Sequence, residues 1–305
     1  MRSSNGFLIA AAGFALLSCG DAVVKSMAGA WPAPAITALR FVFAIPLLMA
    51  LVTINDGKKG FRITKPWIQI ARGMAMGCTS LCFIISLFLM PLTEATAIVF
   101  ASPVITALLS AIFLKEPMHP RLWVASALAL IGVAFVLRPN LAELGWVAFL
   151  PVVSAFFFSI MMIFNRLAAG TGTPAALQWI MASVAAPAVI AGAFMLHLSG
   201  EPSFVIGWPG NDVVLRCAIV AFSASAAHWL IFQGTMRATA ADAAQAVYIQ
   251  LPVALAIDAL VFGHFPDIMA LTGAALIICA GFSMWLHQRQ AKGAQLCGNF
   301  WRRSS

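Results

Sequence analysis

Charged side chains inside long apolar segments are the first residues of this sequence that could do chemistry. Asp21, Lys25, Arg40 and Asp258 all occur in such segments. Charged groups are unfavourable in hydrocarbon, so each one needs a partner or a functional role. Asp21 and Lys25 are four positions apart on one predicted helix and can pair. The four side chains are expected to form a neutral cluster, either as a gate or clamp for a substrate carboxylate or as a structural ion network.

A second set of polar residues lies in the same apolar segments without formal charge. Tyr248 is the single tyrosine of the chain, and it shares one helix face with Gln245 and Pro252. Its hydroxyl needs a partner, which is either a substrate in a cavity or a neighbouring helix. His228 could relay protons or simply bond to another helix. The substrate-binding candidates are Tyr248, Gln245, Gln250, His228, Trp229, Asn165, Thr79 and Ser102.

Two prolines fall near the middle of apolar segments, at Pro103 and Pro252. Proline removes one backbone donor and frees a carbonyl, so it kinks a helix. These two residues are the predicted hinges. A kinked pair could present free carbonyls to a substrate near the middle of a membrane. The alternative is that both helices bend only to pack.

Catalytic and metal-binding motifs are absent from the sequence. It contains no HExxH, GxSxG, phosphate-binding loop or dinucleotide fingerprint. Cys78 and Cys82 share a helix face, but two thiols do not complete a zinc site. We therefore expect no enzyme activity, no metal and no cofactor. An intramembrane lipid-modifying enzyme is the alternative, although it would need several convergent acids or histidines.

The composition places the chain in a membrane. Of its 305 residues, 62% are hydrophobic and 9% are charged, whereas soluble domains carry roughly 25% charged residues. The net charge of +8 does not indicate a nucleic-acid partner, because the basic residues lie in short links between apolar segments. Ten segments could span a bilayer. They are Phe7–Ala28, Pro32–Val52, Trp67–Met90, Thr93–Leu114, Leu122–Leu137, Trp146–Leu167, Pro174–Leu198, Val213–Gly234, Ala241–Phe262 and Ile268–His287.

The second half of the chain repeats the first. A shift of 149 positions places Pro103 on Pro252, Phe113 on Phe262 and Pro117 on Pro266. Five spans per half is an odd number, so the halves must have opposite orientations in the membrane. The predicted organisation is a first repeat over residues 1–140, an inverted second repeat over 141–287 and a basic tail over 288–305. The lysine and arginine distribution predicts that both termini and the tail are cytoplasmic.

These motifs resemble the drug/metabolite transporter superfamily, in its ten-span branch with two EamA-type repeats. The resemblance depends on Gly20, Lys25, Pro34 and Arg40, on Glu94-Ala95-Thr96-Ala97 with Ser102-Pro103, and on Phe113-Leu114-Lys115-Glu116-Pro117. In the second half, Gly263-His264-Phe265-Pro266 departs from the last motif. Length and organisation are similar to those of YddG-like aromatic amino-acid exporters. The resemblance implies an all-α, multi-pass protein of the bacterial inner membrane that exports amino acids, other metabolites or drugs.

The predicted function is therefore that of a secondary transporter. We expect it to export small metabolites, foremost aromatic or other neutral amino acids, by alternating access. Export of drugs or toxic cations is the alternative within the same fold. Because the sequence contains no ATP-binding motif, energy would come from a gradient, and facilitated movement is favoured over proton coupling. The expected partners are a small-molecule substrate and the lipid bilayer, and no nucleic acid is expected. The protein is expected to be a monomer, with a dimer as the alternative.

Overall fold

The regular structure of the chain is helical throughout the part that the computed structural model describes. This part comprises residues 2–90, 92–115, 120–137, 145–238, 243, 245–263, 268–269, 271–273, 275–276 and 279–280. The long helices are α1 (Arg2–Lys25), α2 (Ala33–Asp56), α3 (Pro66–Leu89), α6 (Pro120–Leu137), α8 (Phe149–Ala168), α9 (Pro174–Leu198) and α10 (Asn211–Arg237). The shorter segments are η1 (Gly57–Phe61), α4 (Leu92–Val99), α5 (Ser102–Leu109), η2 (Ser110–Leu114), η4 (Gly145–Ala148), η5 (Pro202–Phe204), η6 (Gln245–Ile249) and α12 (Gln250–Leu260).

Seven helical segments of the described residues are long and apolar enough to cross a membrane. They are Gly6–Lys25, Ala33–Phe61, Pro66–Leu89, Ala95–Leu114, Gly145–Ala168, Pro174–Leu198 and Asn211–Arg237. The segment Gln245–Leu260 is a shorter apolar helix, and most of the predicted span Ile268–His287 lies outside the described residues. The all-α membrane class is confirmed, while the count of ten spans stays a prediction.

Proline marks the start of three long helices. A proline occupies one of the first two positions of α2, α3 and α9. Proline suits the first turn because its missing N–H would have no helical acceptor there. At α9, the Thr173 hydroxyl also accepts a hydrogen bond of 3.2 Å from the backbone N–H of Ala176. The first-turn prolines and the Thr173 hydrogen bond therefore mark where these apolar helices begin.

The segments around the two predicted hinges are not continuous α-helices. α4 ends at Val99 and α5 begins at Ser102, directly before Pro103. The 3₁₀ segment η6 changes to α12 two residues before Pro252. A serine of another helix donates to a carbonyl beside each change: Ser159 to Ser102 O at 2.9 Å and Ser18 to Gln250 O at 3.4 Å. The neighbouring helices therefore supply donors where the regular helical pattern is interrupted.

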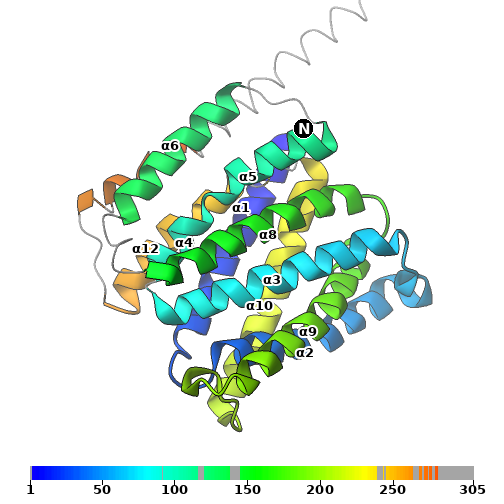
Figure 1. Ribbon diagram of the computed structural model, residues 1–305. Coiled ribbons are helices and arrows are strands. Elements are labelled where there is room, and N and C mark those ends of the chain that lie inside the picture. Colours follow the sequence, from blue (N-terminus) through cyan, green and yellow to red (C-terminus); the bar gives the residue numbers. More distant parts are fainter. Residues whose placement is uncertain are drawn as a thin grey trace, which may run out of the picture.

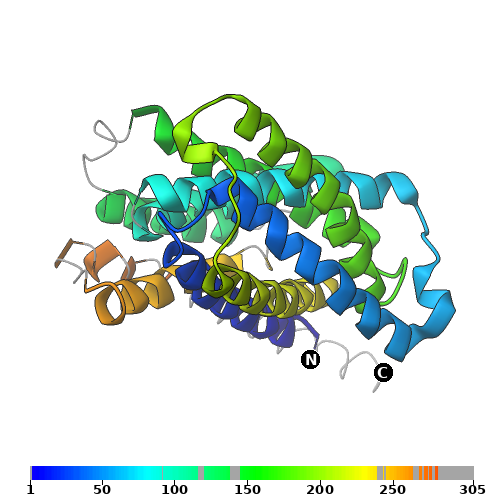
Figure 2. The ribbon, with the colours of Figure 1, turned by 90° about the horizontal axis from the view of Figure 1, so that it is seen from below.

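The helices pack as a bundle in which distant parts of the sequence lie together. α1 packs along α10, α3 along α8, and α2 along α9, while α4 contacts α12. Figure 1 shows α2 and α9 at one edge of the bundle and α6 at the opposite edge. Figure 2 shows α1 and α10 running side by side. The inner helices α1, α3, α8 and α10 thus have neighbours on several sides.

Glycines allow the closest of these contacts. A Cβ atom added to Gly13 of α1 would lie 2.7 Å from the carbonyl oxygen of Ala227 and 2.9 Å from Cγ1 of Ile231, both on α10. A Cβ atom added to Gly73 of α3 would lie 2.4 Å from Cβ of Val184 on α9. Small residues let membrane helices approach until their backbones nearly touch, and this packing stabilises helix pairs in lipid.

Candidate functional site

Two adjoining cavities lie in the centre of the bundle. Their empty volumes are about 500 Å³ and about 350 Å³. Arg40 of α2, Met76 of α3 and His228 of α10 line both cavities, so these residues mark the boundary between them. These volumes include space that is open to the surroundings. Helices from both halves of the chain therefore line the two cavities.

Opposite charges face the larger cavity from two helices. Asp21 of α1 and Arg40 of α2 both line it, and their side chains are only 5% and 7% exposed. The two charges attract each other. Arg40 also donates a hydrogen bond of 2.7 Å to the hydroxyl of Ser80 on α3, and its guanidinium lies 5.3 Å from the ring centre of Phe41. These contacts hold the guanidinium of Arg40, and Asp21 places a carboxyl group on the same cavity.

Uncharged polar groups complete the lining. Thr79, His228 and Gln250, which were predicted from the sequence, all line the larger cavity. Thr79 and Ser154 exchange hydrogen bonds between α3 and α8, at 3.4 Å and 3.0 Å. Gln178 of α9 donates to the carbonyl oxygen of His228 at 3.2 Å. Hydrogen-bonding groups therefore reach the cavities from five helices: α3, α8, α9, α10 and α12.

The remaining binding candidates lie outside the two cavities. Tyr248 is 2% exposed and packs edge-on against Phe100, with ring centres 5.5 Å apart. Gln245 donates to the Ser126 hydroxyl of α6 at 3.2 Å. Trp229 is 41% exposed on the outer surface. Ser102 is buried beside the break between α4 and α5, where its carbonyl accepts from Ser159.

The contacts of the four predicted gate charges are spread over three places. Asp21 and Arg40 share the larger cavity. Lys25, at the end of α1, donates hydrogen bonds of 2.5 Å and 2.8 Å to the carbonyl oxygens of Leu87 and Met90 at the end of α3. Asp258 of α12 accepts a hydrogen bond from the Thr93 hydroxyl of α4. Only the first pair lies where a substrate could touch it in this conformation.

Arg72 is not among the residues predicted from the sequence, although it is the most deeply buried arginine described. It is 0% exposed on α3. Its Nε donates to Oδ1 of Asn165 at 2.7 Å, and its Nη1 donates to Oε1 of Gln69 at 2.9 Å. Asn165, predicted to bind substrate, is therefore bonded to this arginine. The criterion that selected Arg40, a charge within an apolar span, applies equally to Arg72.

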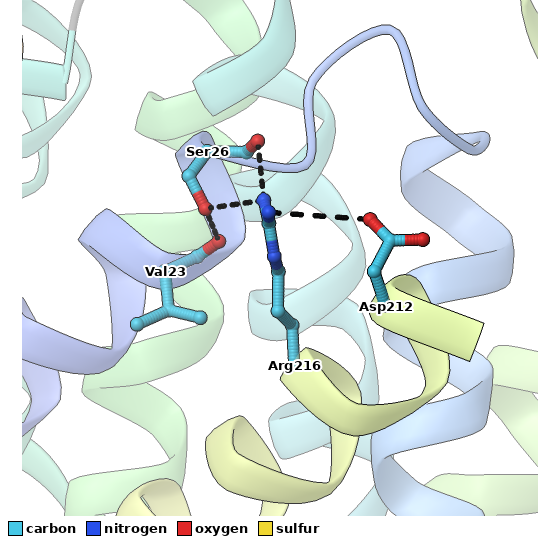
Figure 3. Close-up of polar contacts among 4 residues, drawn as sticks. All are labelled: Val23, Ser26, Asp212 and Arg216. Carbon is cyan, nitrogen blue, oxygen red and sulfur yellow. Dashed lines mark hydrogen bonds and ion pairs between the residues drawn. The ribbon is translucent and has the colours of Figure 1, made fainter. Parts of the chain in front are cut away.

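The opposite end of the bundle carries an exposed arginine contact. Arg216 of α10 donates to the carbonyl oxygen and the hydroxyl of Ser26, at 3.1 Å and 3.3 Å, and lies 4.0 Å from Asp212 (Figure 3). The Ser26 hydroxyl in turn donates to the carbonyl of Val23 at 2.7 Å. This contact joins the turn after α1 to the first turns of α10. It is a surface ion pair and adds only about 0–1 kcal/mol to stability.

The chemistry of the cavities is that of binding. The described residues contain no group of three or more histidine, cysteine or acidic side chains that could hold a metal ion. A neighbouring carboxylate and guanidinium can instead bind the ammonium and carboxylate of a zwitterion. Met76, Phe83 and Phe158 supply apolar walls for the rest of such a molecule.

Comparisons with known proteins agree with a transport role. The profile of the EamA-like transporter family matches residues 4–138. An S-adenosylmethionine uptake transporter of Rickettsia bellii is 24% identical over 259 residues, covering 84% of this chain and 85% of the relative. A riboflavin transporter of Rhizobium johnstonii is 26% identical over 250 residues, covering 79% and 75% of the two chains. One crystal structure has a TM-score of 0.74 at 20% identity and covers 95% of this chain and 100% of its own, which shows that the fold is shared.

Proposed function

Since the protein is a membrane transporter of the EamA-like family, in the drug/metabolite transporter superfamily, and not an enzyme, we propose that it carries a small zwitterionic metabolite. The foremost substrate class is that of aromatic or other neutral amino acids. The molecule would occupy the central cavities and cross the bacterial inner membrane by alternating access. Export of drugs or toxic cations is the alternative for the same cavity.

The observation that carries this proposal is the pair formed by Asp21 and Arg40. Both side chains face one cavity of about 500 Å³, which also has aromatic walls. The carboxylate would bind a substrate ammonium, and the guanidinium would bind a substrate carboxylate through two parallel hydrogen bonds. A purely cationic drug would find Asp21 favourable but Arg40 repulsive. A zwitterion matches both charges.

The names of the relatives support a somewhat larger substrate as a second candidate. S-adenosylmethionine, named for one relative, contains an α-amino acid group that carries both charges. Its adenosine part would need the second cavity, which adjoins the first at Arg40 and His228. Transport is proposed to follow the substrate's own gradient, so export occurs when the cytoplasmic concentration is higher.

The two halves of the chain are proposed to be inverted five-span repeats, over residues 1–140 and 141–287. Helix pairing supports this arrangement, because the pairs of α1 with α10 and of α8 with α3 are equivalent under such symmetry. The serine contacts fit as well, since Ser18 of α1 and Ser159 of α8 each bond to a carbonyl beside a break. Alternating access in such repeats proceeds largely by rocking of one repeat against the other around a fixed site.

The membrane orientation is also a proposal, based on the lysine and arginine distribution. Both termini and the tail over residues 288–305 would be cytoplasmic, and the substrate-binding unit would be the monomer. Under this topology α3 begins at the cytoplasmic side, and α1 ends at the periplasmic side. The Lys25 contact with the end of α3 would then close the periplasmic side, and Arg72 would lie in the cytoplasmic half.

The test is substrate flux into liposomes that contain the purified protein. The panel contains aromatic and neutral amino acids, S-adenosylmethionine, riboflavin and the cationic dye ethidium. We expect saturable flux of a zwitterion, with mutual competition among amino acids, and none of ethidium. Flux of ethidium alone would replace the proposal with toxic-cation transport. Uphill accumulation that depends on an imposed pH gradient would refute facilitated movement.

A further inference from the structure

Arg72 carries a positive charge that the described side chains do not balance. Its hydrogen bonds go to three neutral oxygens: the side-chain oxygens of Asn165 and Gln69, and the carbonyl of Leu177 at 3.2 Å. Within the described residues, its Nη2 has no hydrogen-bond partner. The guanidinium also lies over the ring of Phe232, 5.1 Å from the ring centre. Arg40, by contrast, shares a cavity with Asp21, whose opposite charge attracts it.

An arginine buried in this way is unfavourable unless it has a function. Removing a cation from water costs several kcal/mol, and neutral acceptors compensate only part of this. A carboxylate can form two parallel hydrogen bonds with a guanidinium, and it brings the opposite charge that amide and carbonyl oxygens lack. A carboxylate that reached Arg72 would therefore compete with the neutral oxygens that now hold it. Nη2 and Nη1, or Nη2 and Nε, form the planar pair of donors that a carboxylate needs.

Arg72 lies next to the cavities, on the side where α3 begins. Met76, one turn further along α3, lines both cavities. Leu177 directly precedes Gln178, which lines the smaller cavity. Phe232 follows His228 by one turn of α10, and the charges of both Arg72 and Arg40 act on His228. Arg72 itself lines neither cavity, but residues one turn away on α3 and beside its partners on α9 and α10 do.

We infer that Arg72 is a second carboxylate-binding station, which the substrate occupies when the cytoplasmic side of the bundle is open. The inference depends on the proposed function for its substrate class, an amphipathic molecule with a carboxylate. Opening this side would move Asn165 on α8 and Leu177 on α9 away from α3. The substrate carboxylate then passes from Arg40 to Arg72 and takes the place of the two acceptors. When it leaves, those acceptors return and the side closes.

The experiment measures binding of phenylacetate, which has a carboxylate and an aromatic ring but no ammonium. Phenylacetamide, its neutral analogue of nearly equal shape, is the control ligand. Thermal unfolding of the purified full-length protein in lipid nanodiscs is followed at rising ligand concentration and constant ionic strength. A ligand that binds the folded state raises the midpoint, by an amount that grows with the logarithm of one plus the ratio of ligand concentration to Kd. The proteins are the wild type, Arg40→Gln, Arg72→Met, the double variant, and Arg40→Gln with Arg72→Lys.

We expect phenylacetate to stabilise the Arg40→Gln variant. When Arg72→Met is added to Arg40→Gln, the apparent affinity for phenylacetate should fall about tenfold or more, as for loss of a charged hydrogen-bonding partner. Methionine is chosen because apolar residues often replace buried charges without loss of folding. Lysine at position 72 should restore part of the phenylacetate binding in the Arg40→Gln background, because it returns the positive charge without the planar fork of donors. If position 72 only holds α3, α8 and α9 together, the phenylacetate response should not follow the charge at this position.

Three results would overturn the inference. The first is complete loss of the phenylacetate response in the single variant Arg40→Gln, and the second is an equal phenylacetate response in Arg40→Gln with and without Arg72→Met. The third is that phenylacetamide stabilises the protein as much as phenylacetate does. The liposome flux assay reports on the proposed function separately. If no amino acid or S-adenosylmethionine is transported while the phenylacetate responses follow expectation, the proposed function fails and the carboxylate station stands. If flux is normal and Arg72→Met leaves binding unchanged, the station fails and the proposed function stands.

Discussion

Arg40 on α2 donates a hydrogen bond of 2.7 Å to the hydroxyl of Ser80 on α3, and this bond fixes the guanidinium at the junction of the two central cavities. Asp21 faces the same cavity from α1. The three residues come from three helices, so the geometry of the charged pair depends on the packing of the bundle. Substitutions of Asp21, Arg40 and Ser80 should therefore weaken substrate binding by different amounts.

Arg40→Gln should lower substrate affinity about tenfold or more, since it removes a charged partner of the substrate carboxylate. Ser80→Ala should have a smaller effect, about fivefold, because it only frees the guanidinium to move. Flux into liposomes at varied substrate concentration measures both. Arg62→Gln, in the exposed link before α3, is the matched control and should leave flux unchanged. An unchanged KM in Arg40→Gln would mean that Arg40 does not contact the substrate.

Gln250→Ala should reduce transport more than Tyr248→Phe. Gln250 lines the larger cavity, whereas Tyr248 packs against Phe100 outside both cavities. Loss of one neutral hydrogen bond to the substrate corresponds to about 1 kcal/mol, or about fivefold in affinity. The two variants lie in one segment of the chain, so each controls for damage to that segment. A larger loss in Tyr248→Phe would show that its hydroxyl reaches the substrate in another conformation.

Lys25→Met should make the central cavity more accessible from the periplasmic side. Lys25 bonds to two carbonyl oxygens at the end of α3, where a cation also interacts favourably with the helix dipole. The reporter is the labelling rate of Thr79→Cys by an impermeant thiol reagent, in a background without reactive native cysteines. The expected increase is about tenfold, as for loss of a charged hydrogen bond. Labelling of the exposed Ser203→Cys should not change, and an equal rate at position 79 would contradict a closing role for Lys25.

Gly13→Val should destabilise the protein by roughly 1–3 kcal/mol, as is typical of overpacking in a tight core. The new Cβ would lie 2.7 Å from the backbone oxygen of Ala227, which cannot move without shifting α10. The midpoint of thermal unfolding in nanodiscs measures the effect. Gly207→Ala is the control, because no atom lies within 4 Å of a Cβ added there. Equal midpoints for Gly13→Val and the wild type would mean that α1 and α10 are less closely packed.

Two exposed positions test the proposed topology. Ser203→Cys lies in η5, between α9 and α10, and Lys58→Cys lies in η1, between α2 and α3. With both termini in the cytoplasm, an impermeant reagent should label position 203 in intact spheroplasts and position 58 only after they are opened. The reverse pattern would invert the assignment, and labelling of both positions from one side would exclude it.

The sequence alone predicted most of the long apolar helices of the described residues to within a few positions. A long apolar run in a chain with few charges has to form a helix in lipid, because every backbone group must find its partner within the segment. The starts of α3 and α9 at Pro66 and Pro174 follow from the first-turn preference of proline. The break at Ser102 was predictable too, since Pro103 cannot donate to the preceding turn.

The partners of the buried polar groups were decided by the tertiary structure. Arg72 and Asn165 are 93 positions apart, and no local pattern indicates that they bond to each other. The sequence placed both Tyr248 and Gln250 among the binding candidates, but it could not tell which of them lines a cavity in this conformation. Hydropathy determines that a segment crosses the membrane, but the face it turns inward depends on close packing against other helices, such as the contact of Gly13 with α10. Because those neighbours come from the other half of the chain, only the assembled bundle brings Asp21, Arg40 and His228 around one space.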